Sequence, residues 1–327
     1  MDGVTVSDLE VKIEDLDITQ AVSIYNKYGC LIVRRLNAQY VDSIYKDAEV
    51  AAEHAVSLLS QAVEKSDGWE TPDGTLFIPV SPEYESKLGR DKQIMVLGVN
   101  YMNSAAMTHA AMDKQCLDIV EGILGPNIEL FGNGQCFYKE PAGGNPKYLH
   151  QDNAYFEFAH EGPVGTLNYT VDTNLKKNNG PLYVIPGTHR KGGYGYDKTG
   201  AYSGQTPHSS YIKHVDTSSH LALNLSEWSF DDCILIEGNA GDTIFFHINL
   251  VHGSPPNHSD SPRPTFINRY LSVDDYPVMP LATSVKMRLE QLEKFKKEGG
   301  AMKKRGIVVR GRRQYIGMKW QLDNEHH

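Results

Sequence analysis

The stretch Ile128–Glu140, IELFGNGQCFYKE, marks the point at which the pattern of the chain changes from helical to β-type. From here onward, short apolar runs alternate with Gly, Pro, Asn and Asp, which is typical of an all-β sandwich or barrel. Six further runs follow: YLHQDNAYFEF (148–158), GTLNYTVD (165–172), PLYVIPG (181–187), CILIEG (233–238), DTIFFHINLVHG (242–253) and PTFINRYLSV (264–273). We therefore expect an antiparallel β-core over about residues 128–276.

The region before this core, about residues 1–127, is predicted to be a helical layer. Residues 18–29 have a helix-like pattern and precede the apolar run CLIVRRL (30–36), which resembles a buried strand. Apolar residues at three- and four-residue spacing predict helices over 42–65 and 104–124, the second ending at Gly125-Pro126, and turn residues predict a loop over 66–92. We expect one domain over 1–327, mainly β with flanking helices.

Composition excludes several classes of protein. The chain has 327 residues, 40% hydrophobic and 22% charged, with no apolar run long enough to span a membrane and an acidic, polar start that is unlike a secretory signal. Its four cysteines form no C-x-x-C pair, which argues against a disulfide framework and a cysteine zinc site, so we expect a cytoplasmic protein. The net charge of −9 argues against a nucleic-acid partner.

The last segment, about residues 284–327, has the opposite charge. It holds 12 Lys and Arg against 5 Asp and Glu. Its first interpretation is a solvated helix end and loop lying on an acidic body, and its second is a contact with an anionic substrate or partner.

The candidate chemistry begins at His150-Gln151-Asp152. On a strand, residues two apart project to one face, so an imidazole and a carboxylate converge as a metal requires. Two further His-x-Asp pairs, at 214–216 and 258–260, lie in polar sequences typical of loops, whereas the first lies in an aromatic strand. The first pair is the one with a rigid scaffold.

A third ligand is expected from a distant strand, and the candidate is His252, at the end of an apolar run. Two imidazoles and one carboxylate form the facial triad of non-haem Fe(II), whereas zinc favours cysteines or three histidines. His247 precedes His252 by five residues and would face away on a regular strand, so we interpret it as packed or hydrogen-bonded.

Arg263 follows His252 by eleven residues and opens a strand, where a guanidinium can form a bidentate pair with a carboxylate such as that of 2-oxoglutarate. His258 and Arg269 have the same spacing. Because His258 has the weaker strand context, Arg269 is the one interpreted as structural or ion-paired.

Together these residues resemble the phytanoyl-CoA dioxygenase group of Fe(II)/2-oxoglutarate oxygenases. The matching pieces are His150-Gln151-Asp152 with 154–156, NGPLYVIPGTH (179–189), and GDTIFFH (241–247) leading to 252–254 and Arg263, so that the resemblance covers about residues 20–275. It implies a double-stranded β-helix (jelly-roll, cupin-like) with His150, Asp152 and His252 on iron and Arg263 on 2-oxoglutarate. It also implies cosubstrate contacts from Lys139, Gln135, Ser254 and Asn168, and Phe156 matches an aromatic that contacts substrate. Tyr155 and Tyr148 are further pocket candidates, with core packing as the alternative for Tyr155 and Phe156 and a surface position for Lys139.

The activity implied by this resemblance is hydroxylation, or another oxidation, of an unactivated C–H bond of a small metabolite or natural product. O2 and 2-oxoglutarate are consumed, succinate is released, and ascorbate is a candidate stimulant. Asp152 disfavours a halogenase, in which a small residue replaces the carboxylate. The alternatives are an acyl-CoA 2-hydroxylase, a zinc-binding barrel and a non-enzymatic barrel. We expect a monomer or homodimer, and a lid or pocket wall from the Tyr-rich insert 191–229.

Overall fold

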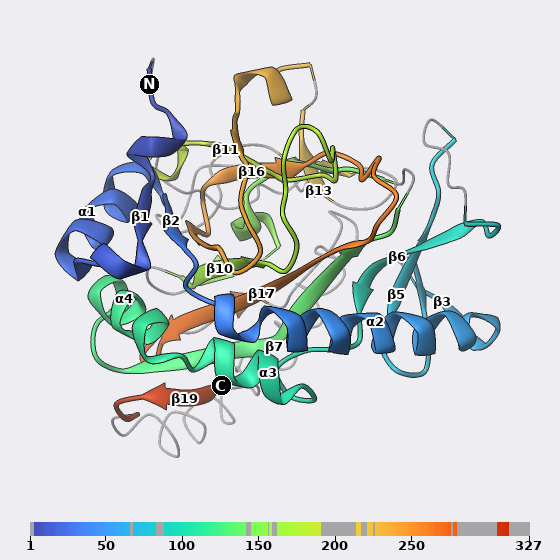
Figure 1. The fold of residues 1–327 in the computed structure, drawn as a ribbon, viewed down its shortest axis with the longest axis horizontal. Helices are drawn as coiled ribbons and strands as arrows, with labels where there is room; N and C mark the ends of the chain where they lie inside the picture. The colour runs from blue at the N-terminus through green and yellow to red at the C-terminus, as the bar shows by residue number, and fades with distance from the viewer. Residues whose placement is uncertain are drawn as a thin grey trace.

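The computed structural model describes residues 3–65, 68–82, 88–141, 145–155, 157–158, 162–190, 214–216, 221–224, 226–275, 277–279 and 306–313. Two facing sheets form its centre (Figure 1). The larger sheet has the order β1 (Glu10–Lys12), β2 (Cys30–Arg34), β15 (Thr243–His247), β10 (Val164–Tyr169), β17 (Arg263–Ser272), β7 (Ile128–Lys139), β6 (Lys92–Leu97), β5 (Leu76–Pro79), β4 (Gly68–Glu70) and β3 (Val63–Lys65), and β19 (Ile307–Arg310) also pairs with β7.

The smaller sheet faces it and has the order β14 (Ile234–Ile236), β11 (Leu182–Ile185), β16 (Val251–Ser254) and β8 (Lys147–His150). Neighbouring strands of this sheet are antiparallel. Two short pairs complete the strands: β12 (His214–Asp216) with β13 (Leu221–Leu223), and β18 (Pro277–Met279) with β9 (Glu157–Phe158). The core is a jelly roll, as predicted.

Apolar side chains alternate along the strands and fill two layers. One layer lies between the sheets and includes Leu167, Val184 and Phe246. The other lies between the larger sheet and four helices, α1 (Ile18–Tyr28), α2 (Val41–Ser57), α3 (Ala105–Ala111) and α4 (Lys114–Leu124). The larger sheet thus packs against the helices with one face. Its other face points into the jelly roll, toward the candidate site.

The helix boundaries follow local capping signals. Asp17 caps the start of α1 by accepting from the Gln20 N–H, and Gly29 ends it with φ of 73°. The single helix predicted over 104–124 is two helices, because the Asp113 carboxylate caps a new start. No helix in the described ranges is long and apolar enough to cross a membrane.

The first 127 residues are less helical than predicted. The helix predicted over 42–65 ends at Ser57, and residues 63–65 form β3. The loop predicted over 66–92 contains β4, β5 and the first residue of β6, because antiparallel pairing through β6 to β7 extends the larger sheet. This extension (Figure 1) forms one wall of a pocket described below.

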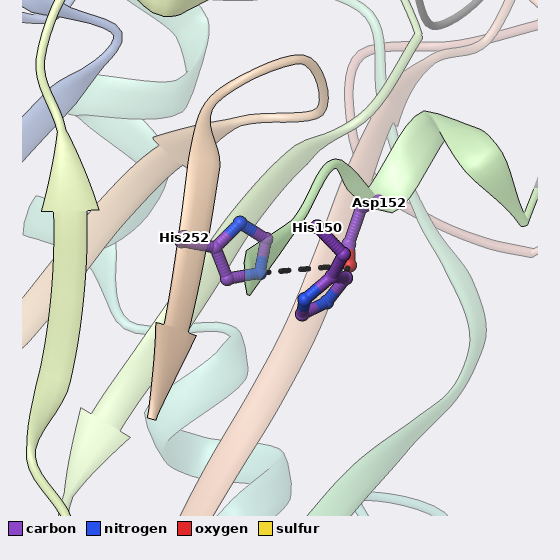
Figure 2. A group of neighbouring side chains, drawn as sticks. All are labelled: His150, Asp152 and His252. Atoms are coloured by element: carbon purple, nitrogen blue, oxygen red, sulfur yellow. Dashed lines mark ion pairs between the residues drawn. The ribbon is translucent and has the colours of Figure 1, made fainter. Parts of the chain in front are cut away.

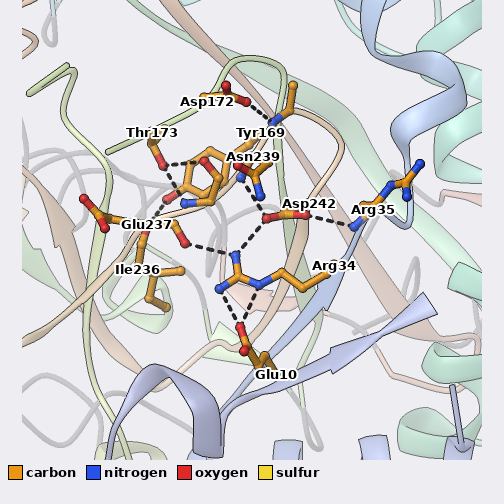
Figure 3. A network of polar contacts seen from close by, with 12 residues as sticks. Glu10, Arg34, Arg35, Tyr169, Asp172, Thr173, Ile236, Glu237, Asn239 and Asp242 are labelled. Carbon is orange, nitrogen blue, oxygen red and sulfur yellow. Dashed lines mark hydrogen bonds and ion pairs between the residues drawn. The ribbon is translucent and has the colours of Figure 1, made fainter. Parts of the chain in front are cut away.

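A polar network ties the N-terminal strands to the jelly roll (Figure 3). The Arg34 guanidinium pairs with Glu10 at 2.6 Å and with Asp242 at 2.7 Å. The buried Asp242 carboxylate also accepts from the backbone N–H groups of Arg35 and Asn239, both at 2.8 Å. The network therefore locks β2 against the turn that precedes β15.

The described part of the basic segment, residues 306–313, differs from the predicted helix end and loop. It contains β19, which lies against β7. Arg310 pairs with Asp118 and Glu121 of α4, and Arg313 pairs with Glu129. Both guanidiniums thus form ion pairs with acidic side chains of the rest of the fold.

Candidate metal centre and cosubstrate site

Three side chains meet at the facing ends of β8 and β16 (Figure 2). His150 ends β8 and lies directly opposite His252 of β16 in the antiparallel register. Asp152 Oδ1 lies 3.5 Å from His150 Nε2 and 3.7 Å from His252 Nε2. One ligand atom from each residue lies within 4.8 Å of the others, so the group can hold a metal ion.

The predicted strand geometry at this motif is correct only in part. The strand ends at His150, and Asp152 begins a short 3-10 turn. Gln151 keeps an extended conformation with φ of −111° and ψ of 133°, and its side chain is tied to the Asn249 carbonyl at 2.6 Å. The extended residue between them lets Asp152 project to the same side as His150.

The backbone orients both imidazoles. Each Nδ1 lies within hydrogen-bond distance of the carbonyl two residues earlier, at 2.8 Å from Tyr148 for His150 and 2.9 Å from Leu250 for His252. Donation by Nδ1–H leaves the Nε2 lone pair facing the centre, as in metal-binding histidines.

Electrostatics favour the ligand-competent protonation states. Burial lowers the pKa of His150 to about 4, with a contribution from His252, and burial also lowers the pKa of His252. Burial acts to raise the pKa of Asp152, but the Arg269 guanidinium, His150 and His252 together outweigh it and hold that pKa well below its usual range. At neutral pH the site offers two neutral imidazoles and one carboxylate.

This donor set fits non-haem iron, because two imidazoles and one carboxylate leave coordination positions open. The three fully buried cysteines, Cys30, Cys116 and Cys136, lie in the apolar layers, where burial raises the pKa of each to about 12. No other group of three potential ligands was found among the described residues.

Arg263 lies deep in the same barrel and is 3% exposed. Its guanidinium donates to the Asn179 carbonyl at 3.2 Å, to Thr265 Oγ1 at 2.8 Å and to Ser254 Oγ at 3.2 Å. All three acceptors are neutral, and no carboxylate of the described chain pairs with it. Burial lowers its pKa to about 10, which leaves it charged at neutral pH. A buried guanidinium with neutral partners fits the carboxylate of a bound ligand.

Three other predicted cosubstrate residues lie near Arg263 or between it and the metal centre. Lys139 is opposite Arg263 in the β7–β17 register, and its ammonium donates to the carbonyls of Ser254, at 2.9 Å, and Pro255. Gln135 lies on the same strand, and its Oε1 accepts from Arg269 at 3.0 Å. Ser254 links Arg263 to the Gly180 carbonyl, which its Oγ bonds at 2.7 Å.

Asn168 is placed differently from its prediction. Its Oδ1 accepts from Asn37 at 2.6 Å and Thr243 at 2.9 Å, and its Nδ2 donates to the Phe266 carbonyl at 2.8 Å. These contacts use both ends of the amide and place it on the face of β10 that the helices cover, because successive side chains along a strand point to opposite faces. We therefore assign it a structural position.

The predicted pocket aromatics fall near the metal centre, except Phe156, which lies outside the described residues. Tyr155 is buried, with its ring edge-on to His150 at 5.7 Å between centroids. Tyr148 is half-buried on β8 and supplies the carbonyl that orients His150. The insert predicted as a lid, 191–229, is described only at 214–216, 221–224 and 226–229.

The other histidines in the described ranges stay outside the metal group. His258 is exposed in a loop, as expected, whereas His214 begins the short strand β12 rather than lying in a loop. His247 is packed: its Nδ1 accepts from the Asn249 N–H at 2.9 Å, and its ring lies 5.2 Å from that of His189.

Two basic residues near the metal centre make contacts that the sequence interpretation did not specify. Arg269, interpreted as structural or ion-paired, pairs with the candidate ligand Asp152 at 3.1 Å. Lys147, which was not singled out, donates to Tyr155 Oη at 3.0 Å. The available signal was its position three residues before His150 at the start of the same strand.

Comparisons with known proteins agree with this geometry. The model of the phytanoyl-CoA dioxygenase (PhyH) family matches residues 25–265. A probable alpha-ketoglutarate-dependent hypophosphite dioxygenase from Stutzerimonas stutzeri is 27% identical over 198 residues, covering 60% of this chain and 64% of that protein. Human peroxisomal phytanoyl-CoA dioxygenase is 28% identical over 174 residues, covering 52% and 47%. Each match thus spans less than two thirds of the relative.

A solved structure shows the same fold. The epimerase SnoN, in complex with Fe3+, alpha ketoglutarate and nogalamycin RO, superimposes with a TM-score of 0.54 at 16% identity, covering 90% of this chain and 96% of that one.

Proposed function

The chain belongs to the phytanoyl-CoA dioxygenase (PhyH) family, and on that premise we propose that it is an Fe(II)- and 2-oxoglutarate-dependent dioxygenase. Its reaction is hydroxylation, or another oxidation, of a C–H bond of a small molecule. The observation that carries the proposal is the presence of two features in one barrel: a buried His-Asp-His group, and the buried Arg263, whose partners are all neutral.

The role that we propose for each residue follows from its position in the site. His150, Asp152 and His252 would hold the iron, and Arg263 with Ser254 would hold the distal carboxylate of 2-oxoglutarate. When bound, the metal and cosubstrate supply dioxygen activation coupled to decarboxylation to succinate. Arg269 holds one oxygen of Asp152, so that the other faces the imidazoles. Tyr155 packs against His150 and limits the access of water from that side.

No comparable structural observation supports the alternative functions. An acyl-CoA substrate would need cations for its phosphates, but Arg310 and Arg313 of the described basic segment are paired with acidic groups. A zinc-binding or non-enzymatic barrel gives no role to Arg263. We therefore favour a small molecule without CoA. The four cysteines are free thiols, in keeping with the cytoplasmic location that we propose.

The test combines metal analysis with succinate release. Protein purified without oxygen and loaded with Fe(II) should bind 2-oxoglutarate and release succinate, slowly alone and faster when a metabolite extract contains the substrate. Arg263→Ala should retain iron and lose 2-oxoglutarate binding. Tight zinc binding without any binding of 2-oxoglutarate to the iron form would contradict the proposal.

A further inference from the structure

The Lys147 ammonium lies beside the metal centre, and no acidic group of the described residues forms an ion pair with it. It donates to Tyr155 Oη at 3.0 Å and lies 5.1 Å from the centroid of that ring. The Tyr155 hydroxyl in turn donates to the Leu221 carbonyl at 3.2 Å, so its proton is already committed. In the described part of the chain, Lys147 therefore has one neutral acceptor for its three N–H donors.

No carboxylate in the described part of the chain pairs with Lys147. The nearest candidate by charge is Asp152, but its two oxygens face Arg269 and the two imidazoles. Burial lowers the pKa of Lys147 to about 7, with Asp152 acting to raise it and Arg269 to lower it. A half-buried, unpaired ammonium is costly, and a bound anion would offset that cost.

Lys147 also lines a pocket whose lining does not include the three metal ligands. The pocket lies between β5 and β6 on one side and the end of β7 and the start of β8 on the other. Ile78, Ile94 and Phe137 contribute apolar wall, and Lys139 is a second cation at its edge. The one carboxylate of the lining, Glu140, is occupied by Arg90 and by the Ile94 N–H at 2.7 Å. The pocket is thus apolar with a positive end.

Arg263 and Lys147 have different hydrogen-bond partners. Arg263 contacts Asn179, Thr265 and Ser254, whereas the Lys147 side chain contacts Tyr155. If Arg263 holds the distal carboxylate of the cosubstrate, Lys147 remains for a different anion on the side where Tyr155 meets His150.

We propose that Lys147 anchors an oxyanion of the substrate, either a carboxylate or a phosphorus oxyanion, whose apolar part lies in the pocket beside β5 and β6. The proposal rests on the proposed function, because it takes the metal centre as the place of reaction. It defines the substrate class as an anionic, partly apolar small molecule and makes Lys147 a specificity-determining residue.

The experiment measures binding separately from turnover. Calorimetric titrations use oxygen-free protein holding Fe(II) and 2-oxoglutarate. The probes are saturated monocarboxylates from acetate to decanoate, the matching phosphonates, and the neutral amides. Lys147→Met removes the charge at similar size, Lys147→Arg keeps it, and Lys46→Met removes the charge of an exposed lysine on α2. Binding of 2-oxoglutarate is titrated in each variant.

We expect anions to bind and amides to bind more weakly. Lys147→Met should weaken anion binding by about tenfold or more, since one charge-assisted hydrogen bond is lost. Lys147→Arg and Lys46→Met should bind anions as the wild type does, and 2-oxoglutarate binding should be unchanged in every variant. The carboxylate and phosphonate arms show which oxyanion is preferred.

Four results would overturn the inference: binding of no anion of either series, equal binding of anions and amides, unchanged anion binding in Lys147→Met, or loss of 2-oxoglutarate affinity in Lys147→Met. The last would make Lys147 a cosubstrate contact while the proposed function stands. Failure of the wild-type iron form to bind 2-oxoglutarate would instead refute the proposed function.

Discussion

Arg269 Nη2 lies 3.1 Å from Asp152 Oδ2, while the other oxygen of that carboxylate faces both His150 and His252. The same guanidinium donates from Nη1 to Gln135 at 3.0 Å. It therefore ties the candidate metal ligand to β7 and fixes which oxygen points to the centre. Arg269 is a positioning residue, and its effect should be separable from that of Arg263.

Arg263→Lys should weaken 2-oxoglutarate binding strongly, because lysine cannot form two parallel hydrogen bonds to a carboxylate. Losing a buried charge pair costs about 2–5 kcal/mol, roughly 30-fold to several thousand-fold in affinity. The measurement is an oxygen-free titration of the charge-transfer absorption band of the Fe(II) protein with 2-oxoglutarate.

Arg269→Lys is the matched control on the same strand. It should bind 2-oxoglutarate nearly as the wild type does, but weaken iron binding by about 10- to 100-fold, because the support of a metal ligand is lost. Near-normal 2-oxoglutarate binding in Arg263→Lys, with binding abolished in Arg269→Lys, would reverse the two assignments.

His150→Ala, Asp152→Ala and His252→Ala should each lose iron, because each empties one of three coordination positions. Metal content after dialysis and thermal unfolding together separate this effect from misfolding. His258→Ala, in an exposed loop, serves as the control and should keep its iron. If His258→Ala lost iron as His252→Ala does, the third ligand would be wrongly assigned.

Sequence periodicity was sufficient to predict an element where the local pattern and the tertiary environment favour the same structure. The helix at Ile18–Tyr28 and the strand at Cys30–Arg34 were predictable because a cap, an apolar stripe and a continuous apolar run are all local signals. His252 was identifiable because it lies in an apolar run, which the structure places on a strand opposite His150.

Long-range pairing was not predictable in the same way. The strands within 68–97 are stabilised by hydrogen bonding to one another and to β7, so their turn-rich sequence resembles a loop. The Arg269–Asp152 pair joins residues 117 apart, and Asn168 lies on the helix-covered face through contacts to Asn37 and Thr243. No local spacing encodes these relationships.

Asp242→Asn should destabilise the fold by about 3–5 kcal/mol, because it leaves Arg34 beside an amide in place of a buried carboxylate. Unfolding in denaturant, monitored by circular dichroism, gives the free energy. Glu14→Gln breaks the exposed pair with Arg35 and should cost about 0–1 kcal/mol. Equal effects of the two changes would show that the network around Asp242 contributes little to stability.

Lys147→Met should stabilise the fold, and the gain should depend on pH. Burial lowers the pKa of Lys147 from its ordinary 10.5 to about 7, with Asp152 opposing this shift and Arg269 adding to it; Lys139 is a further charge nearby, and Tyr155 is its neutral partner. Below pH 7 the lysine is charged in both states, so the wild type bears the full cost of burying the charge. Between pH 7 and 10.5 the folded form sheds the proton while the unfolded chain keeps it, so wild-type stability rises with pH.

The gain from Lys147→Met should therefore be greatest below pH 7 and should shrink steadily as the pH rises toward 10.5. Thermal unfolding of the wild type, Lys147→Met and Lys46→Met across this range measures it, and Lys46→Met should show no such trend because that lysine is exposed. Adding a bound oxyanion should remove the difference at low pH by supplying the missing counter-charge, since a ligand that binds only the folded state stabilises it. A gain that is independent of pH would show that the pKa of Lys147 is the same in the folded and the unfolded chain, so that burial does not penalise its charge, and the case for an oxyanion as its counter-charge would fall.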